Sequence, residues 1–367
     1  MNMVLHDYFS GIGGFHLGLQ NAGLKFSDVY YSEIDKHAIA NYKNNFKDAK
    51  YIGDVKSILS ADTRRPNIIT FGSPCQDFSL AGKRKGLGGA RSSLIEYALR
   101  AISKFRPDVF IWENVKGAFS SNNSEDFWAI IQAFTNIGGY RLEWQLLNTS
   151  WVLPQNRERI YLVGHLADTF RNWGGVFPVR ENDFSSEKLF RKKRFGLQPK
   201  VSTTITTRYG NVPSDTYVAQ KGRGYIKSGL SKVCPTISMS SFEHNTAVVQ
   251  VKSANNRGYE IANPGDSINL QFPNSKTRRG RVGRRVSQTL DCACNQGVYQ
   301  DRAIRRLTEI ECERLQGFPD DWTKYGVYDD KEKEIAKTNR YKLIGNAVTV
   351  DVVELVGKRI LNNYKLK

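Results

Sequence analysis

Apolar residues in the first part of the chain form short runs that alternate with stretches of helical period. Short apolar runs bounded by turn residues predict buried strands, and apolar residues recurring every three to four positions predict amphipathic helices. Strands are predicted at Val4–Phe9, Val29–Glu33, Asn67–Phe71, Val109–Trp112, Arg141–Asn148 and Arg159–Gly164. Helices are predicted from the first glycine-rich turn to Ala22 and at Lys36–Phe46, Arg91–Phe105 and Ser124–Ile137. This alternation indicates βαβ units, an α/β fold and a mostly parallel sheet.

The pattern changes after Gly164. Residues 166–301 are rich in Gly, Asn, Ser and Thr, with short β-prone stretches and no helical period. Helical character returns at Thr308–Gln316 and at Ala347–Ile360. Because a chain of 367 residues can bury one large core and a smaller one, we predict two domains. Residues 1–165 and 302–367 form the α/β domain, and residues 166–301 form a smaller, inserted domain of strands and loops.

Three segments of the insert share a pattern of Val, two residues, Thr and then Ile or Leu. They are Val201–Ile205, Val233–Ile237 and Val286–Leu290. Their unequal spacing does not fit a solenoid repeat. We interpret them as three similar strands, and a duplicated recognition unit remains the alternative.

Positive charge is concentrated in the same insert. The chain carries a formal charge of +18, and residues 166–301 hold 21 Lys and Arg against 10 Asp and Glu. The cluster Arg191–Arg194 is the densest part. A basic block inside an otherwise nearly balanced chain indicates a polyanionic partner, and nucleic acid is the leading one.

Several other classes are disfavoured. No apolar run approaches the roughly 18 residues of a membrane span, and the N-terminus lacks the basic and apolar regions of a signal peptide. The five cysteines are scattered and odd in number, which indicates reduced thiols in a cytoplasm. Cys292 and Cys294 have no second pair at zinc-site spacing, so no metal is expected.

A glycine-rich turn, Phe9–Gly14, follows the first strand and opens the first helix. Such a turn permits close approach of a ligand to a helix N-terminus. Residue 16 is His, so the spacing is not that of a dinucleotide fingerprint. Glu33 at the end of the second strand is placed for a ribose diol, and Asp54 could accept from an adenine amino group. An adenosine without a pyrophosphate fits this set, and S-adenosylmethionine is the candidate.

A thiol and a carboxylic acid follow two of the predicted strands. Cys75 comes after Pro74 just beyond one strand, and Glu113 ends the next. The carboxyl ends of parallel strands meet at one edge of a sheet, so the two groups are expected side by side. Arg157 and Arg159 are available to favour a thiolate. None of the five histidines lies in a comparable motif, which disfavours a protease.

These groups fit chemistry at carbon 5 of cytosine, which is too weak a nucleophile to be methylated unaided. Addition of a thiolate to C6 makes C5 reactive, while a carboxylic acid at N3 and an arginine at O2 stabilise the charge that develops. Glu113 can act as the donor only if burial raises its pKa. The ring must be reached from both faces, so the nucleotide must be flipped out or single-stranded.

The ordered motifs resemble those of C5-cytosine-specific DNA methyltransferases of bacterial or phage type. The matching positions are the Phe9–Gly14 loop, Glu33, Asp54, Pro74-Cys75-Gln76, Arg91, Glu113-Asn114-Val115, Gln155–Arg159, Arg306-Leu307-Thr308, Glu313–Pro319 and Gly345–Val348. The resemblance implies a Rossmann-like, S-adenosylmethionine-dependent methyltransferase sheet with a smaller β and loop target recognition domain. It also implies that the final helix packs beside the first motif.

The resemblance carries over roles residue by residue. Cys75 would be the nucleophile and Glu113 the N3 partner, Arg159 would contact the base, and Arg157 would support the catalytic loop or the DNA. The cofactor would be held by Phe9, Gly11, Gly13, Gly14, Glu33, Ile34, Asp54, Val55, Asn346 and Ala347. Position 34 is often aromatic in this family and stacks on the adenine; here it is Ile34, so weaker cofactor affinity is the most that is expected.

Double-stranded DNA is the expected partner. Its candidate contacts are Gln76, Ser79, Arg91, Gln155, Arg208, Arg223, Arg257, Arg278 and Gln288. Arginine and glutamine can read base edges, although most basic residues of such a domain contact phosphates. The target sequence, and whether there is more than one, cannot be read from the chain.

Three alternatives remain. One branch of the family methylates tRNA, but its Cys-Phe-Thr signature is absent here. A non-catalytic DNA-binding protein would have lost Cys75, Glu113 or Arg159, and a thiol-based nucleotide hydrolase would leave the adenosine-type pocket unexplained. A partner of a restriction endonuclease, a phage protective enzyme and a solitary methylase would look alike, and a monomer is expected.

Overall fold

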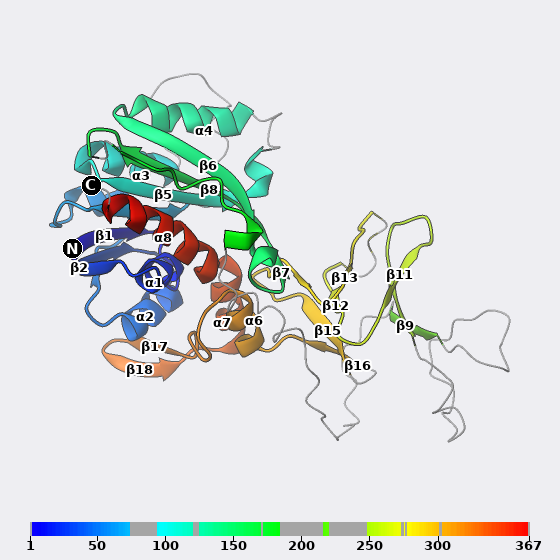
Figure 1. The fold of residues 1–367 in the computed structure, drawn as a ribbon. Helices are drawn as coiled ribbons and strands as arrows, with labels where there is room; N and C mark the ends of the chain where they lie inside the picture. Colours follow the sequence, from blue (N-terminus) through cyan, green and yellow to red (C-terminus); the bar gives the residue numbers. More distant parts are fainter. Residues whose placement is uncertain are drawn as a thin grey trace, which may run out of the picture.

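The computed structural model describes residues 2–73, 94–119, 125–169, 172–183, 216–219, 248–272, 275, 277–300 and 303–365. Its main body is built on a seven-stranded sheet with the order β3-β2-β1-β4-β5-β8-β6 (Figure 1). The strands are β1 (Asn2–Tyr8), β2 (Lys25–Ser32), β3 (Lys50–Tyr51), β4 (Ile68–Gly72), β5 (Val109–Val115), β6 (Tyr140–Asn148) and β8 (Glu158–Leu166). All six predicted strands are therefore confirmed.

The sheet is mostly parallel, as expected. Strands β1 to β5 pair in parallel, whereas β8 runs antiparallel to both β5 and β6. The order reverses at β1 and β4, since β1 connects through β2 toward one edge and β4 leads toward the other. In open α/β sheets this switch point, at the carboxyl ends of the strands, is where ligands bind.

Helices cover both faces of the sheet (Figure 1). Helices α1 (Gly14–Asn21), α2 (Lys36–Asn45) and α8 (Val350–Lys365) lie on one side, and α3 (Leu94–Phe105) and α4 (Glu125–Asn136) lie on the other. One buried cluster joins Phe15 and Val356 to the strands, and another joins Ile102 and Phe134 to the opposite face. Both are close-packed cores of the kind that drives folding.

Helix ends follow from local sequence signals. Asp35 caps α2, with its carboxylate accepting hydrogen bonds from the backbone N–H groups of His37 and Ala38. Thr308 and Glu311 form a reciprocal capping box at the start of α6 (Glu309–Leu315). The predicted helix at Thr308–Gln316 is thereby confirmed to within a residue at each end. The final helix begins three residues later than expected and extends to Lys365.

Both ends of the chain meet in the main body. Helix α8 packs on α1, and a Cβ added at Gly18 of α1 would lie 2.6 Å from the Val353 Cβ of α8. A Cβ at Gly14 would lie 2.7 Å from Val348 Cγ2. The expectation that the final helix packs beside the first motif is confirmed. These glycines allow the two helices to approach closely.

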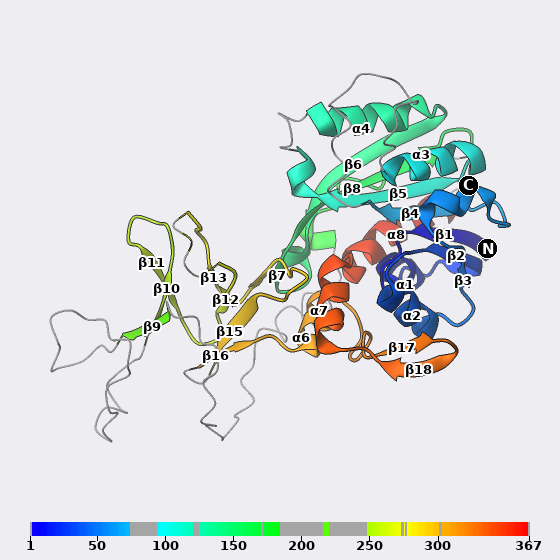
Figure 2. The ribbon, with the colours of Figure 1, turned by 180° about the vertical axis from the view of Figure 1, so that it is seen from behind.

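The described part of the insert is rich in short strands and lies beside the main body (Figures 1 and 2). One sheet has the order β11-β10-β9 and another β13-β12-β15-β16. Their bounds are β9 (Thr216–Ala219), β10 (Val248–Lys252), β11 (Tyr259–Ala262), β12 (Ser267–Asn269), β13 (Val282–Gly283), β15 (Gln296–Gln300) and β16 (Ala303–Arg306). Val249, Ile268 and Tyr299 belong to a small core of their own. The β-rich character expected from the sequence is present.

The β-rich region is joined to the main body, and so is the described segment that precedes it. Strand β14 (Ser287–Gln288) pairs in parallel with β7 (Gln155–Asn156), just before β8. Before entering the region, the chain packs on the main body through Asp183, because Val176 and Val179 lie in its core and Arg359 pairs with Asp183 at 3.1 Å. The remaining elements are α7 (Lys337–Asn346) and a hairpin of β17 (Tyr325–Tyr328) and β18 (Lys331–Glu334).

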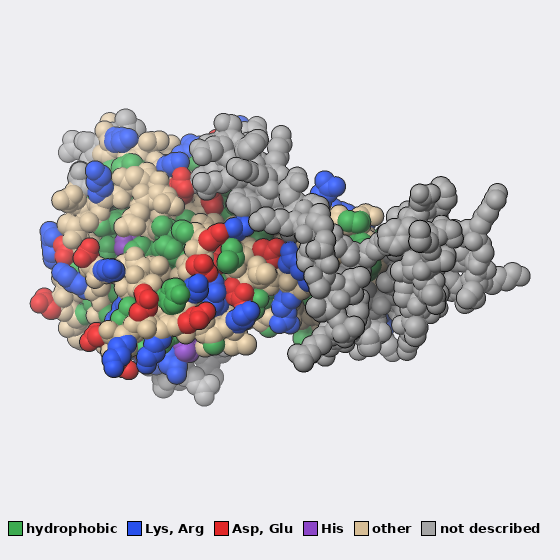
Figure 3. Space-filling model, turned by 90° about the horizontal axis from the view of Figure 1, so that it is seen from below, with side chains coloured by type: hydrophobic (Ala, Val, Ile, Leu, Met, Phe, Trp, Pro, Cys, Tyr) green, Lys and Arg blue, Asp and Glu red, His purple; other side chains and the backbone are tan. Residues whose placement is uncertain are grey.

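Surface charge on the main body is mixed. Figure 3 shows basic and acidic side chains interspersed over the face that it presents. Among the helices that the structure describes, none is long and apolar enough to cross a membrane.

Candidate active site

A carboxylate and a guanidinium meet at the carboxyl end of β5. Glu113 lies opposite Gly72 of β4 in the sheet register, and Arg159 enters from the neighbouring strand β8. Arg159 Nε is 3.1 Å from Glu113 Oε1, and both side chains are largely buried. Gly72 leaves room for the acid, because a Cβ there would lie 3.3 Å from Glu113 Oε2. The pair therefore occupies the edge where the sequence places the chemistry.

Burial decides the ionisation of Glu113. Loss of hydration raises the pKa of this carboxyl, while the charges of Arg159 and Arg157 lower it by less. The net direction is upward, which favours the protonated acid over the carboxylate. This direction agrees with the expectation that burial raises the pKa of Glu113.

Asn114 fixes the chain that leads toward the predicted nucleophile. Its side-chain amide donates to the backbone oxygen of Ser73 at 3.1 Å and to Ser73 Oγ at 3.2 Å. Trp112 Nε1 also donates to Ser73 Oγ, at 3.1 Å. Ser73 is thus anchored on β5 by two side chains flanking Glu113. Cys75, Gln76, Ser79 and Arg91 lie outside the described residues.

Arg157 joins three parts of the fold through its buried guanidinium. Its side chain is buried and its guanidinium donates to three backbone oxygens: Leu290 at 3.3 Å, Gly345 at 3.2 Å and Ala347 at 2.8 Å. Arg157 therefore links the segment before β8 to the insert and to the Gly345–Val348 motif. Both expected roles of Arg157, support of the catalytic loop and support of the DNA, stay predictions.

Gln155, which is expected to contact DNA, has protein partners in this structure, and its contact with DNA stays a prediction. Its side chain is fully buried. Its amide nitrogen donates to the Leu315 carbonyl at 2.8 Å and its amide oxygen accepts from Leu290 N at 3.1 Å. The pairing of β7 with β14 turns this residue inward, so it links the main body to the insert.

Two further residues of this junction were not predicted. Gln316 donates from Nε2 to the Ile344 carbonyl at 3.1 Å, and Thr349 donates to Gln316 Oε1 at 2.9 Å. Both side chains are buried. Their partners lie 28 and 33 residues away in sequence, so no local pattern indicates them. The Gln-Gly-Phe-Pro motif at 316–319 was the available signal.

Glu33 and Asp54 lie at the carboxyl ends of neighbouring strands. The carboxylate of Glu33 accepts from Gly11 N at 2.9 Å, Ile34 N at 2.8 Å and Asp35 N at 3.0 Å. Asp54 caps the short helix η1 (Val55–Ser60) through Lys56 N. Ser32 Oγ donates to the Gly53 carbonyl at 2.8 Å, which fixes one strand end against the other. The two acids thus line one rim of the sheet.

The glycines of the first loop have different roles. Gly11 and Gly13 have positive φ angles of 54° and 81°, as does Phe9 at 52°. A Cβ at Gly11 would meet nothing within 4 Å, whereas one at Gly13 would lie 2.3 Å from Phe46 Cε2. Gly13 and Gly14 are therefore required by packing. Gly11 faces open space, next to the Glu33 carboxylate.

The remaining cofactor candidates differ in exposure. Ile34 is 72% exposed, while Val55 and Ala347 are buried. Asn346 is exposed, and its Oδ1 accepts a hydrogen bond from the Cys292 thiol at 2.9 Å. The insert thus also contacts the Gly345–Val348 motif through Cys292 and Asn346.

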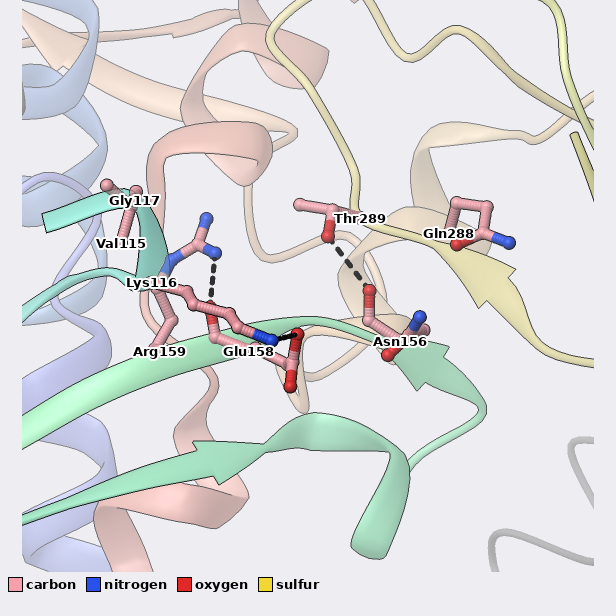
Figure 4. A pocket seen from close by; sticks show the side chains of 8 residues that line it. All are labelled: Val115, Lys116, Gly117, Asn156, Glu158, Arg159, Gln288 and Thr289. Carbon is pink, nitrogen blue, oxygen red and sulfur yellow. Dashed lines mark hydrogen bonds and ion pairs between the residues drawn. The ribbon is translucent and has the colours of Figure 1, made fainter. Parts of the chain in front are cut away.

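A pocket of about 260 Å³ lies beside the acid–arginine pair. It is lined by Val115, Lys116, Gly117, Asn156, Glu158, Arg159, Gln288 and Thr289 (Figure 4). Lys116 pairs with Glu158 at 2.8 Å, and Thr289 Oγ1 donates to the Asn156 carbonyl at 2.8 Å. The pocket joins the end of β5 to the insert, and its lining is polar. Gln288 therefore lines the same pocket as Arg159.

The other candidate readers of DNA are distributed over the β-rich region. Arg257 is exposed. Arg278 is half-buried, donates to Gln271 Oε1 at 2.7 Å and lies over the ring of Phe272, so its guanidinium is already held in place. Arg208 and Arg223 lie outside the described residues, as do Arg191–Arg194 and the first two Val-x-x-Thr-Ile segments. In the described part of the chain, no group of His, Cys, Asp or Glu could hold a metal ion.

Comparison with known proteins identifies the family. A family model of C-5 cytosine-specific DNA methylases matches residues 3–362. The chain is 30% identical to the type II methyltransferase M.HpaII of Haemophilus parainfluenzae, over 97% of this chain and 88% of that protein. It is 29% identical to the type II methyltransferase M.Bsp6I of a Bacillus strain, over 96% of each, and 27% identical to the orphan methyltransferase M.SPRI of Bacillus phage SPR, over 97% of each.

Solved structures agree at the level of the fold. The Entamoeba histolytica methyltransferase EhMeth has a TM-score of 0.57 at 16% identity, covering 100% of this chain and 99% of that one. The sheet, the acid–arginine pair and the match over nearly the whole length are consistent with one another. The chain belongs to the C-5 cytosine-specific DNA methylase family.

Proposed function

We propose that this protein transfers a methyl group from S-adenosylmethionine to carbon 5 of a flipped-out cytosine in a specific double-stranded DNA sequence. The observation that carries the proposal is the buried Glu113–Arg159 pair. It lies at the strand end next to Ser73, from which the chain continues to Cys75. An acid with a raised pKa beside a guanidinium matches what charge development on a cytosine ring requires.

The residues at the rim of the sheet fit an adenosine cofactor. Glu33 presents a carboxylate for a ribose diol, Asp54 a carboxylate for an amino group, and Gly11 open space between the first loop and the sheet. S-adenosylmethionine, when bound, supplies an electrophilic methyl group. Glu33 and Asp54 would bind and orient it, while Ile34 and Asn346 would contact it from two sides.

Cys75 and Glu113 would activate the base together. The Cys75 thiolate forms a bond from Sγ to C6 of cytosine, while protonated Glu113 donates to N3 and Arg159 donates to O2. The electron pair of the C5–C6 bond then becomes available at C5. After C5 has been methylated, a base removes the C5 proton, the C6–S bond breaks to return the thiolate, and N3 returns its proton to Glu113. General acid help of this kind typically contributes about 10²–10⁴-fold to the rate.

Target recognition is assigned to the insert. We propose that residues 166–301 form the target recognition domain and that residues 1–165 and 302–367 form the catalytic domain. The excess of basic residues in the insert supports this division, and so does the pocket that joins Gln288 to Arg159. Arg257 and Gln288 are the described candidates for direct DNA contacts.

The biological setting is proposed on the relatives. Their names include both type II methyltransferases and orphan methyltransferases of phages. We infer a monomeric enzyme of a bacterial cytoplasm or of a phage-infected host cell. A type II methyltransferase would share its target with a cognate restriction endonuclease, whereas an orphan methyltransferase would have no such partner.

Cytosine methylation sequencing tests the proposed function. DNA from cells expressing the wild-type protein is compared at single-base resolution with DNA from cells expressing Cys75→Ala. Methylation confined to a short motif, and lost in the variant, supports the proposal. Equal methylation in both samples, or none above background in either, rejects it. Parallel sequencing of RNA from the same cells would detect methylated tRNA, the outcome of the main alternative.

A further inference from the structure

Two large apolar side chains are exposed beside the Glu33 carboxylate. Ile34 is 72% exposed and Tyr51 is 42% exposed. Ile34 follows Glu33 in the chain, and Tyr51 ends the neighbouring strand β3. A single exposed apolar residue has no special meaning. Two of them at one end of the sheet, next to a pair of carboxylates, form a surface suited to a ring with polar edges.

The position of Tyr51 is fixed by the sheet and by its hydroxyl. Tyr51 pairs with Tyr31 of β2 in the strand register. Its hydroxyl donates to the backbone oxygen of Glu33 at 3.0 Å. The ring is therefore held against the turn that presents Glu33 and Ile34. An aromatic side chain fixed in this way loses little entropy on binding a ligand.

Three tyrosine and phenylalanine rings behind Tyr51 have a structural role. Tyr31 is fully buried and stacks on Tyr42 at 4.0 Å between ring centres. Phe46 lies 4.7 Å from Tyr42 and packs on α1 through His16. Tyr51 lies 5.4 Å from Tyr31 and is the outermost ring of the series. Of these rings, only Tyr51 keeps a large surface open to a ligand.

The hydroxyl of Tyr51 also lies in the field of both acids. Partial burial, and then the charges of Glu33 and Asp54, raise the pKa of the Tyr51 hydroxyl. The phenol therefore stays neutral near pH 7 and continues to donate to Glu33. Tyr51 is thus close enough to feel the charge of both acids that are proposed to bind the cofactor.

We propose that Tyr51 is a specificity-determining residue for the cofactor, forming with Ile34 the apolar surface that contacts the purine ring. This inference rests on the proposed use of S-adenosylmethionine. Aromatic surface in contact with a ring is worth more than its area alone, and Ile34 by itself offers only an aliphatic face. Tyr51 adds the aromatic surface that position 34 lacks, and it orients Ile34 through the Glu33 backbone.

Binding of S-adenosylhomocysteine measured by isothermal titration calorimetry tests this assignment. The variants are Tyr51→Ala and Tyr51→Phe, with Tyr325→Ala as a matched control. Tyr325 is similarly exposed, at 37%, and lies in the β17–β18 hairpin. We expect Tyr51→Ala to weaken binding about tenfold, Tyr51→Phe to stay within about threefold because it keeps the ring, and Tyr325→Ala to match the wild type.

Unfolding temperatures and steady-state kinetics separate a ligand contact from a purely structural role. A ligand contact raises the KM for S-adenosylmethionine in Tyr51→Ala while kcat and the unfolding temperature stay close to wild type. Should Tyr51→Ala fail to fold, Tyr51→Leu, which keeps apolar bulk without a ring, gives the same comparison. Wild-type affinity in folded Tyr51→Ala or Tyr51→Leu would overturn the inference. A wild-type protein that binds no S-adenosylhomocysteine would instead reject the proposed cofactor.

Discussion

Glu113 is held between two opposing influences. Burial favours its neutral form, and Arg159 at 3.1 Å favours its charged form. The pKa of Glu113 is raised because burial prevails, so the protonated acid persists to a higher pH than in an exposed carboxyl. A glutamic acid exposed at the surface has a pKa of about 4.3.

Replacement of Glu113 by Gln tests this acid. The amide cannot donate a titratable proton, so we expect kcat to fall by about 10²–10⁴-fold with little change in cofactor affinity. In the wild type the donor is present below the raised pKa of Glu113 and is lost as the pH rises through it. That alkaline decline should be absent from the kcat profile of the variant. The same decline in both proteins would assign it to another group.

Arg157 is expected to act on stability. Arg157→Ala leaves three buried backbone oxygens without their charged donor, which should lower the free energy of unfolding by roughly 3 kcal/mol. Arg257→Ala, at an exposed position, should change it by less than about 0.5 kcal/mol. Urea denaturation measures both. Unchanged stability of Arg157→Ala together with weakened DNA binding would contradict this structural role and favour a contact with DNA.

At the scale of elements, the close packing of α1 on α8 brings the two ends of the chain to one site. The junction of β7 and β14 does the same for the insert, since β14 is hydrogen-bonded to the segment that leads into Arg159. Both arrangements place residues distant in sequence around the carboxyl edge of one sheet. The site is therefore assembled from elements that fold as a unit.

Two glycine variants separate packing from ligand access. In Gly18→Ala, a Cβ would lie 2.6 Å from the Val353 Cβ, and such overpacking typically costs about 1–3 kcal/mol. In Gly11→Ala, a Cβ would meet no atom within 4 Å, and the cost comes from the φ of 54°, roughly 1 kcal/mol. We expect Gly18→Ala to lower the melting temperature more than Gly11→Ala does. We expect Gly11→Ala to weaken S-adenosylhomocysteine binding more than Gly18→Ala does. The reverse order would contradict these roles.

The sequence was most informative where function depends on strand ends. Glu113 and Glu33 lie at the ends of strands that local periodicity predicts, and parallel strands bring their ends to one edge. The burial of Gln155 and Arg157 shows what this reasoning does not indicate. Polar residues in a loop-like motif resemble DNA contacts, yet pairing of β7 with a strand more than a hundred residues away buries them. Such non-local pairing leaves no trace in hydrophobic periodicity.

At the scale of the whole molecule, charge is divided between two parts. Residues 166–301 carry most of the basic excess, while the main body shows mixed charge on the face in Figure 3. The pocket of Figure 4 lies where the two parts meet.

Binding to DNA should therefore depend steeply on salt. Each phosphate neutralised by Lys or Arg contributes about −0.9 to the slope of log K against log salt concentration. Titrations of a duplex between about 50 and 200 mM salt, read by fluorescence anisotropy, should show a fall of more than tenfold in affinity. Affinity independent of salt would be incompatible with recognition by the basic insert.

Trapping of the covalent intermediate tests the central claim most directly. A duplex carrying 5-fluorocytosine at the methylated position is incubated with the protein and S-adenosylmethionine. Fluorine cannot leave as the proton does, so the C6–S bond should persist, and mass spectrometry should locate the DNA on Cys75. Cys75→Ser should give no adduct, and Cys292→Ser should give the wild-type amount. Methylation of ordinary cytosine without any trapped adduct, or an adduct on another residue, would contradict the account.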